Sequence, residues 1–200
     1  TNITISNAKT KSEYIARFQP MYQFVNINEN INDYNKVNKT QILLNSYYFI
    51  NDDTLSNPLT STVEKNWYVN DATWESTIAH EFGHYISFLT LLRESNFENI
   101  TFVSKNNINK INEILNNYGN DGHSIMIINK ALDNYNKKYN TSISINDFAS
   151  SISKYAATFD KSNRLIADET IAEAIHDYYL HGDNMQPESK EIVNVIKDML

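Results

Sequence analysis

The pentapeptide His80-Glu81-Phe82-Gly83-His84 constrains this chain more than any other feature of its sequence. In a helix, residues four positions apart lie about 40° apart around the axis, so His80 and His84 can coordinate one metal ion. Glu81 lies about 100° from His80, beside the metal rather than on it. A carboxylate in that position can take a proton from a water molecule that attacks a carbonyl group. The motif therefore predicts a helix that carries two zinc ligands and a general base.

The residues around the motif favour a helix over 73–93. Apolar side chains recur every three or four residues and form a stripe roughly opposite the two histidines, made of Trp74, Ile78, Phe82, Ile86 and Leu89. Asp71 and Thr73 are both candidates for the N-cap of this helix. Gly83 leaves room for close packing against a neighbouring element. The helix is thus expected to keep its metal-binding face and its core face separate.

Patterns elsewhere in the chain predict a helix over 10–25, a strand over 40–50 and a short strand over 66–70. Two further helices are predicted over 105–118 and 124–139, and their aliphatic stripes are typical of scaffold. Because an edge strand can pair with an extended peptide, we expect substrate to bind along the 40–50 strand. Helices and a small twisted sheet together predict the α+β class.

Length and composition fit one globular domain over 1–200, since the chain has 200 residues of which 41% are hydrophobic. Within it, 1–72 would hold the first helix and the sheet, 73–93 the motif helix, and 94–200 further helices. The net charge of −7 argues against a nucleic-acid partner. The chain has no cysteine, so histidines and carboxylates must hold any metal. We expect no membrane span, because the apolar runs are too short.

A catalytic zinc ion normally has three protein ligands and an open position for water, so one ligand is missing from the motif. The pattern HExxHxxGxxH is excluded, because Ser87 and Thr90 occupy the positions of its glycine and its third histidine. A glutamate at the spacing of thermolysin-like enzymes would fall near Val103, where no glutamate-containing helical pattern stands. The third ligand must come from further along the chain.

The segment 169–176 is the best candidate region. It is strongly helical, and it places Glu169, Glu173 and His176 on the face opposite its apolar stripe. A cation beside them would offset the repulsion between two acidic side chains four residues apart. The residues alone leave open which glutamate binds the metal, and His176 is an alternative to Glu173. His123 and His181 fall at a turn and at a helix end, without spacing typical of a metal site.

Three segments together resemble lethal-factor-like zinc metallopeptidases: HEFGH at 80–84, SKYA at 153–156 and ETIAEAI at 169–175. This family includes the catalytic lobe of anthrax lethal factor, clostridial Pro-Pro endopeptidases and related domains of toxins and phage head proteins. The resemblance implies a zincin-like (gluzincin) fold and assigns a role to each of six residues. By this resemblance the zinc ligands would be His80, His84 and Glu169, and the general base would be Glu81. Tyr155 would donate a hydrogen bond to the oxyanion, and Glu173 would orient a ligating histidine.

The interval between Tyr155 and Glu169 is longer here than in the family, so 160–168 is expected to loop out. We expect a metalloendopeptidase with one zinc ion and a protein or peptide substrate. The chain begins at Thr1 without a signal-peptide pattern, as a mature fragment would, and a secreted or delivered toxin domain or a phage-associated one is favoured. The alternatives are a non-catalytic structural or binding lobe with the same fold, and a zinc hydrolase that acts on a non-peptide bond. An intact Glu81 favours an enzyme, since a binding module has no need for it.

Overall fold

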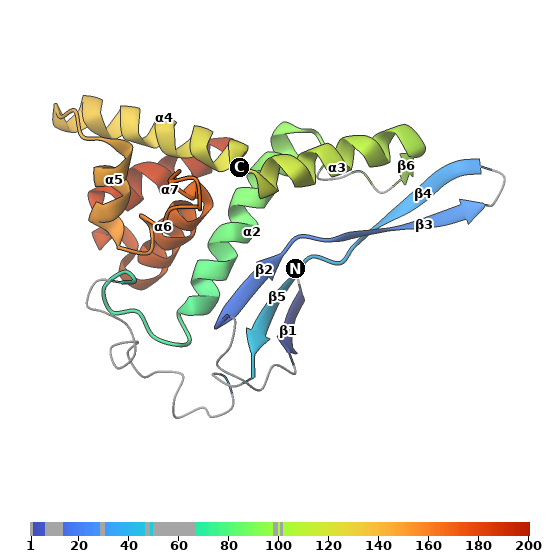
Figure 1. Cartoon of the computed structure of the whole chain (residues 1–200), viewed down its shortest axis with the longest axis horizontal. Coiled ribbons are helices and arrows are strands. Elements are labelled where there is room, and N and C mark those ends of the chain that lie inside the picture. Colours follow the sequence, from blue (N-terminus) through green and yellow to red (C-terminus); the bar gives the residue numbers. More distant parts are fainter. Residues whose placement is uncertain are drawn as a thin grey trace.

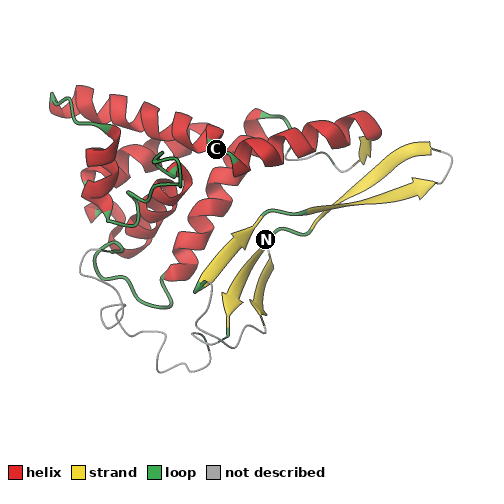
Figure 2. Cartoon of the chain, viewed as in Figure 1, coloured by secondary structure: helices red, strands yellow, loops and turns green. Residues whose placement is uncertain are grey.

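The structure, a computed structural model, describes residues 2–6, 14–28, 31–46, 49, 67–97, 100 and 102–200. The long helix α2 (Thr77–Glu94) lies at the centre, with strands on one side and a group of helices on the other (Figures 1 and 2). The other helices of the described residues are α3 (Lys105–Gly119), α4 (Gly122–Tyr139), α5 (Ile145–Ile152), α6 (Ala167–His181), the 3-10 helix η2 (Gly182–Asn184) and α7 (Pro187–Met199). The predicted α+β class and the two helices after the motif helix are confirmed.

The described strands form two sheets of three strands each. In the first, β5 (Gln41–Asn45) lies between β1 (Asn2–Ser6), to which it is parallel, and β2 (Ala16–Gln19), to which it is antiparallel. The second is antiparallel, with β4 (Ile31–Asn38) between β3 (Tyr22–Asn28) and β6 (Phe102–Ser104). The β3–β4 hairpin extends away from the centre beneath α3 (Figure 1).

The position of β5 corrects one expectation. Of the predicted strand over 40–50, residues 41–45 form β5, and 47, 48 and 50 lie outside the described residues. Because β5 has a neighbour on each side, it offers no free edge to a substrate. Among the described strands, β1 and β2 form the two edges of this sheet, and β2 is the one that lies beside α2 (Figure 1). An extended ligand close to α2 would therefore pair with β2 rather than with β5.

The predicted helix over 10–25 is wrong where the structure describes it, because β2 and β3 occupy that stretch; 10–13 lie outside the described residues. Pro20 explains part of the difference, since proline in a helix interior costs about 3 kcal/mol. Aromatic side chains such as Phe18, Tyr22 and Phe24 also favour strands. Burial alternates along β3, where Tyr22 and Phe24 are half-buried and Gln23 and Val25 are exposed. The spacing of three and four residues was coincidental.

Two smaller expectations before the motif helix are also wrong. The predicted strand over 66–70 is irregular over 67–70, with residue 66 outside the described part. The helix begins at Thr77 rather than at residue 73, and its N-cap is Ser76. Thr73 forms a turn ahead of the helix instead, because its backbone N–H donates to Ser76 Oγ (2.8 Å) and Ser76 N–H donates to Thr73 Oγ1 (3.1 Å).

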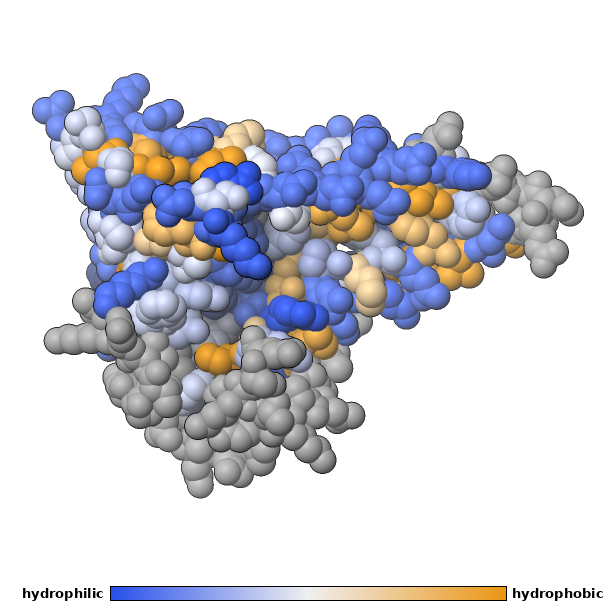
Figure 3. Space-filling view, in the orientation of Figure 1, coloured by the Kyte–Doolittle hydropathy of each residue, from blue (hydrophilic) through white to orange (hydrophobic). Residues whose placement is uncertain are grey.

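Two hydrophobic clusters lie on opposite sides of α2. One joins the sheets to α2 and α3 through Phe18, Ile42, Phe88, Val103 and Ile111, among others. The other fills the space among α4, α5, α6 and α7. Hydrophilic residues cover the outer surfaces of α3 and α4, and apolar residues show between α3 and the β3–β4 hairpin (Figure 3). Of the described helices, none has the length and apolar character needed to cross a membrane.

The helices α2 and α6 approach each other very closely at Gly83. A Cβ atom added at Gly83 would lie 2.5 Å from the Cα and 3.0 Å from the carbonyl oxygen of Ala172. Both atoms belong to the backbone of α6 and cannot move aside as a side chain can. The absence of a side chain at Gly83 therefore lets the two helices pack backbone to backbone.

Gly83→Ala should lower the free energy of unfolding by about 2 kcal/mol or more, because the added methyl group would force the helices apart. Gly119→Ala is the matched control, since Gly119 is also helical and its Cβ would have no neighbour within 4 Å. That change should leave stability unchanged or raise it by up to about 1 kcal/mol. Urea unfolding of both variants measures the difference, and equal midpoints would contradict the close-packing argument.

Candidate metal centre

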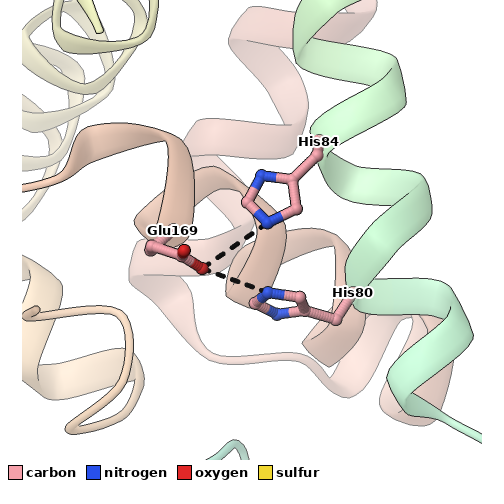
Figure 4. A group of neighbouring side chains, drawn as sticks. All are labelled: His80, His84 and Glu169. Carbon is pink, nitrogen blue, oxygen red and sulfur yellow. Dashed lines mark hydrogen bonds and ion pairs between the residues drawn. The ribbon is translucent and has the colours of Figure 1, made fainter. Parts of the chain in front are cut away.

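The two histidines of the motif converge with Glu169 on one point. His80 and His84 lie one turn apart on α2, and Glu169 lies in the first turn of α6 (Figure 4). Glu169 Oε2 is 3.1 Å from His80 Nε2 and 3.5 Å from His84 Nε2. The side chains come from segments far apart in sequence, and the close approach of α2 and α6 at Gly83 brings them together.

The two distances from Glu169 Oε2 suit a tetrahedral metal ion such as zinc. Tetrahedral zinc with bonds of about 2.0–2.2 Å to nitrogen and oxygen sets its ligand atoms about 3.4 Å apart. The observed 3.1 and 3.5 Å bracket that value. His80, His84 and Glu169 thus form a group of ligand atoms that can hold a metal ion.

Glu173 lies deeper than Glu169 and is already fully bonded. Its Oε1 accepts from the Nδ1 atoms of His80 (2.9 Å) and His176 (3.3 Å). Its Oε2 accepts from the backbone N–H of Val69 (3.0 Å) and the hydroxyl of Ser153 (2.7 Å). The Glu173 side chain is 0% exposed, whereas that of Glu169 is 21% exposed. The geometry therefore favours Glu169 as the ligand and Glu173 as the group that orients His80.

A second group of ligand atoms is formed by His80, Glu173 and His176. His176 is fully buried, and its Nε2 lies 2.7 Å from Ser76 Oγ. Every ligand atom of this group already has a hydrogen-bond partner in the protein. Neither Glu173 nor His176 lines the cavities that open at His80. His176 therefore supports Glu173 rather than replacing it.

The two imidazoles lie among carboxylates. Burial lowers the pKa of His80, but hydrogen bonds to Glu169 and Glu173 outweigh burial and raise that pKa to about 9. Burial likewise lowers the pKa of His84, which the charges of Asp168 and Glu169 raise well above its usual value. Burial raises the pKa of Glu169, yet the two histidines hold it well below its usual range. Metal binding near neutral pH must therefore displace protons from the imidazoles.

Glu81 borders the centre from the position next to His80 on α2. It is 7% exposed, and one carboxylate oxygen accepts a hydrogen bond from the backbone N–H of Phe18 in β2. Because it bonds to Glu81, that N–H takes no part in the pairing of Phe18 with Ile42 of β5. The carboxylate of Glu81 thus links α2 to β2 beside the two histidines.

Tyr155 follows α5 in a turn rather than lying within a helix. Its ring centre is 5.3 Å from that of His80, and its backbone N–H donates to the carbonyl of Trp67 (2.7 Å). The predicted looping out is observed over 160–166, where a bridge between Phe159 and Leu165 folds the segment back on itself, whereas Ala167 and Asp168 belong to α6. Thr170 Oγ1 then donates to the carbonyl of Ala156 (2.7 Å), which ties the segment to α6.

A cavity of about 310 Å³ opens onto these groups. Its lining includes His80, Glu81, His84, Tyr155 and Glu169, together with β2 residues and Tyr118. A second cavity of about 230 Å³ shares His80, Glu81 and Tyr155 with the first. The two cavities are therefore neighbours that share these three side chains.

Asp168 and Tyr118 belong to this site and were not selected from the sequence. Asp168 Oδ2 accepts from His84 Nδ1 (2.7 Å) and from the hydroxyl of Tyr118 (2.7 Å). An acidic residue in the first turn of a helix is ordinary, because the helix dipole favours it there. The only signal in the sequence was its position directly before Glu169.

The other two histidines lie outside the centre, as expected. His123 is buried between α2 and α4, where its Nε2 lies 2.8 Å from Thr90 Oγ1. His181 ends α6, and its Nδ1 donates to Asp177 Oδ1 (2.6 Å).

Comparisons of this chain with protein-family models, with curated proteins and with solved structures found no significant match.

The two glutamates of α6 should respond differently to substitution. Glu169→Gln should abolish stoichiometric zinc binding with little loss of stability, because it removes a ligand at the rim. Glu173→Gln should lower zinc affinity by about 10–100-fold, as loss of a group that orients a ligand does, and should also destabilise the fold. Zinc content after dialysis against a chelator, with thermal unfolding alongside, measures both effects. Greater zinc loss from Glu173→Gln would reverse the assignment.

Proposed function

We propose that this protein is a zinc-dependent metalloendopeptidase with a zincin-like fold, similar to the lethal-factor-like family, and that it cleaves an extended protein or peptide segment. The observation that carries the proposal is the convergence of His80, His84 and Glu169 at zinc-ligand spacing, with Glu81 and Tyr155 around the same cavity. A site that only stored or sensed a metal would need neither of the last two groups.

A zinc ion held by the three ligands supplies a Lewis acid that polarises a carbonyl group and lowers the pKa of water. Glu81 follows His80 directly on α2, so its carboxylate lies beside the ligands and faces the cavity. In the proposed reaction Glu81 takes a proton from the attacking water and later delivers it to the leaving amine. Glu173 holds His80 in the orientation that the centre requires.

Tyr155 is suited to donate a hydrogen bond to the carbonyl oxygen of the substrate as negative charge develops there. Burial and the neighbouring charge of Glu169 raise the pKa of Tyr155 far above its usual value. A raised pKa favours the protonated hydroxyl, which suits a hydrogen-bond donor. Contact with the ring of His80 keeps Tyr155 on the cavity side of the ligands.

The substrate would lie along β2, which offers backbone groups to an extended chain at its free edge. Ala16 and Phe18 line the cavity from β2, opposite Glu169 on α6. Main-chain pairing of this kind suits a peptide better than a small ester or amide, and it supports a peptidase over a hydrolase of another bond.

Glu81→Gln should lower peptide cleavage by about 10²–10⁴-fold while zinc stays bound, because the change removes the base but no ligand. Glu75→Gln is the matched control, since Glu75 is exposed just ahead of the same helix and should leave cleavage unchanged. Digestion of a peptide library by the zinc-loaded proteins, with zinc content measured in parallel, gives both quantities. A wild-type protein that binds one zinc ion and cuts no peptide would overturn the peptidase and favour the non-catalytic lobe.

Tyr155→Phe should lower kcat by roughly 10²–10³-fold with little change in KM, since the lost hydrogen bond is made mainly in the transition state. Tyr179→Phe on α6 serves as the control, because Tyr179 is 62% exposed. Steady-state kinetics on the best library substrate distinguish the two. If KM rises while kcat holds, Tyr155 binds substrate instead.

A further inference from the structure

The two ligating histidines are held in the same way by two different carboxylates of α6. His80 Nδ1 donates to Glu173 Oε1 at 2.9 Å, and His84 Nδ1 donates to Asp168 Oδ2 at 2.7 Å. Both Nε2 atoms face Glu169 between them. The resemblance of the sequence to a family assigns a role to Glu173 and none to Asp168.

Asp168 is itself fixed by groups from two other helices. The hydroxyl of Tyr118, near the end of α3, donates to Oδ2 at 2.7 Å. The hydroxyl of Ser124, in the first turn of α4, donates to Oδ1 at 3.0 Å. The Asp168 backbone N–H donates to Asp121 Oδ1 at 2.9 Å. The carboxylate of Asp168 is therefore held at both oxygens and is 14% exposed at the side chain.

We propose that Asp168 is a positioning residue for the metal, and that Tyr118 acts through it. By accepting the proton on Nδ1, Asp168 selects the imidazole tautomer whose Nε2 lone pair is free for the metal. By holding the ring edge, it keeps that lone pair directed at the point where Nε2 of His80 and Oε2 of Glu169 converge. The connection between α3 and α4 thereby contributes to metal affinity without touching the metal. The inference depends on the proposed function only in requiring that a metal binds.

A purely structural role for Asp168 would have a different consequence. A carboxylate in the first turn of a helix ordinarily caps the free N–H groups of its own helix. Here Asp121 takes that task, because its carboxylate accepts the N–H groups of Ala167 and Asp168. The side chain of Asp168 is thus left for His84, Tyr118 and Ser124. If Asp168 only linked helices, its loss would lower stability and leave zinc affinity unchanged.

Asp177 provides a matched control on the same helix. It is 1% exposed, and its Oδ1 accepts from His181 Nδ1 at 2.6 Å while its Oδ2 accepts from the N–H of Gln186 at 2.8 Å. Asp177 is therefore a buried aspartate that holds a histidine outside the metal centre. Asp177→Asn should destabilise the fold and leave the zinc affinity unchanged.

The experiment measures zinc affinity of the full chain, stripped of metal, by competition with a chromogenic chelator. Asp168→Ala should weaken zinc binding by about 10–100-fold, the range seen for such orienting groups. Asp168→Asn should weaken it less, because an amide oxygen can still accept from Nδ1. Tyr118→Phe should weaken it by roughly threefold to tenfold, since Asp168 keeps its charge and loses one anchor. Cobalt substitution adds a readout at the metal, and the visible absorption of Co²⁺ should shift in the Asp168 and Tyr118 variants alone.

Each result decides a different question. A wild-type protein that binds no zinc overturns the proposed metal centre, and this inference with it. A wild-type protein that binds zinc, together with an Asp168→Ala variant of equal affinity and unchanged cobalt spectrum, overturns the inference alone. If Asp168→Ala does not fold, as far-ultraviolet circular dichroism would reveal, Asp168→Asn and Tyr118→Phe decide instead. Wild-type affinity in both of these variants would then overturn the role of Asp168.

Discussion

The close contact between α2 and α6 is the constraint on which the rest of the site depends. Gly83 lies between the two histidines of the motif, and the backbone of Ala172 occupies the space that any side chain there would fill. The residues next to this contact are the ones that meet, with His80 and His84 on one helix and Glu169 and Glu173 on the other. A separation larger by one methyl group would pull Glu169 away from both imidazoles. The glycine of the motif therefore sets the size of the centre.

Around that contact, each polar group is held by a different part of the chain. The buried carboxylate of Glu173 joins α2, the segment before it at Val69 and the turn after α5 at Ser153. A buried charge of this kind is tolerated only when it is fully paired. Its bonds fix the backbone on either side of the cavity, including the turn that carries Tyr155. The turn that carries Tyr155 is thus held by the same hydrogen bonds that hold the buried carboxylate of Glu173.

Sequence reasoning succeeded where periodicity and ligand chemistry coincide. The motif helix, the two helices after it and the helix that carries Glu169 all have uninterrupted patterns, and the three ligand candidates lie together as expected. It failed in the N-terminal region, where aromatic residues at helical spacing belong to β2 and β3. Pro20, which disfavours a helix interior, lies between these two strands. It could not identify Asp168, because the sequence pattern of an aspartate in the first turn of a helix is the same whether its side chain contacts a histidine or solvent. The edge position of β2 is a property of strand order, which local patterns do not contain.

The hydrogen bond from the Phe18 N–H to Glu81 has a consequence for how the cleft is filled. This N–H belongs to the row of outward groups that an added strand would use, and the resting protein already satisfies it with its own carboxylate. A peptide that paired with β2 at Phe18 would have to offer a carbonyl oxygen in place of that carboxylate. The Phe18 N–H would then exchange one hydrogen-bond acceptor for another, and the number of its hydrogen bonds would stay the same. One outward group of β2 is therefore already bonded within the protein, and under the proposed function an extended ligand would release Glu81 by taking its place.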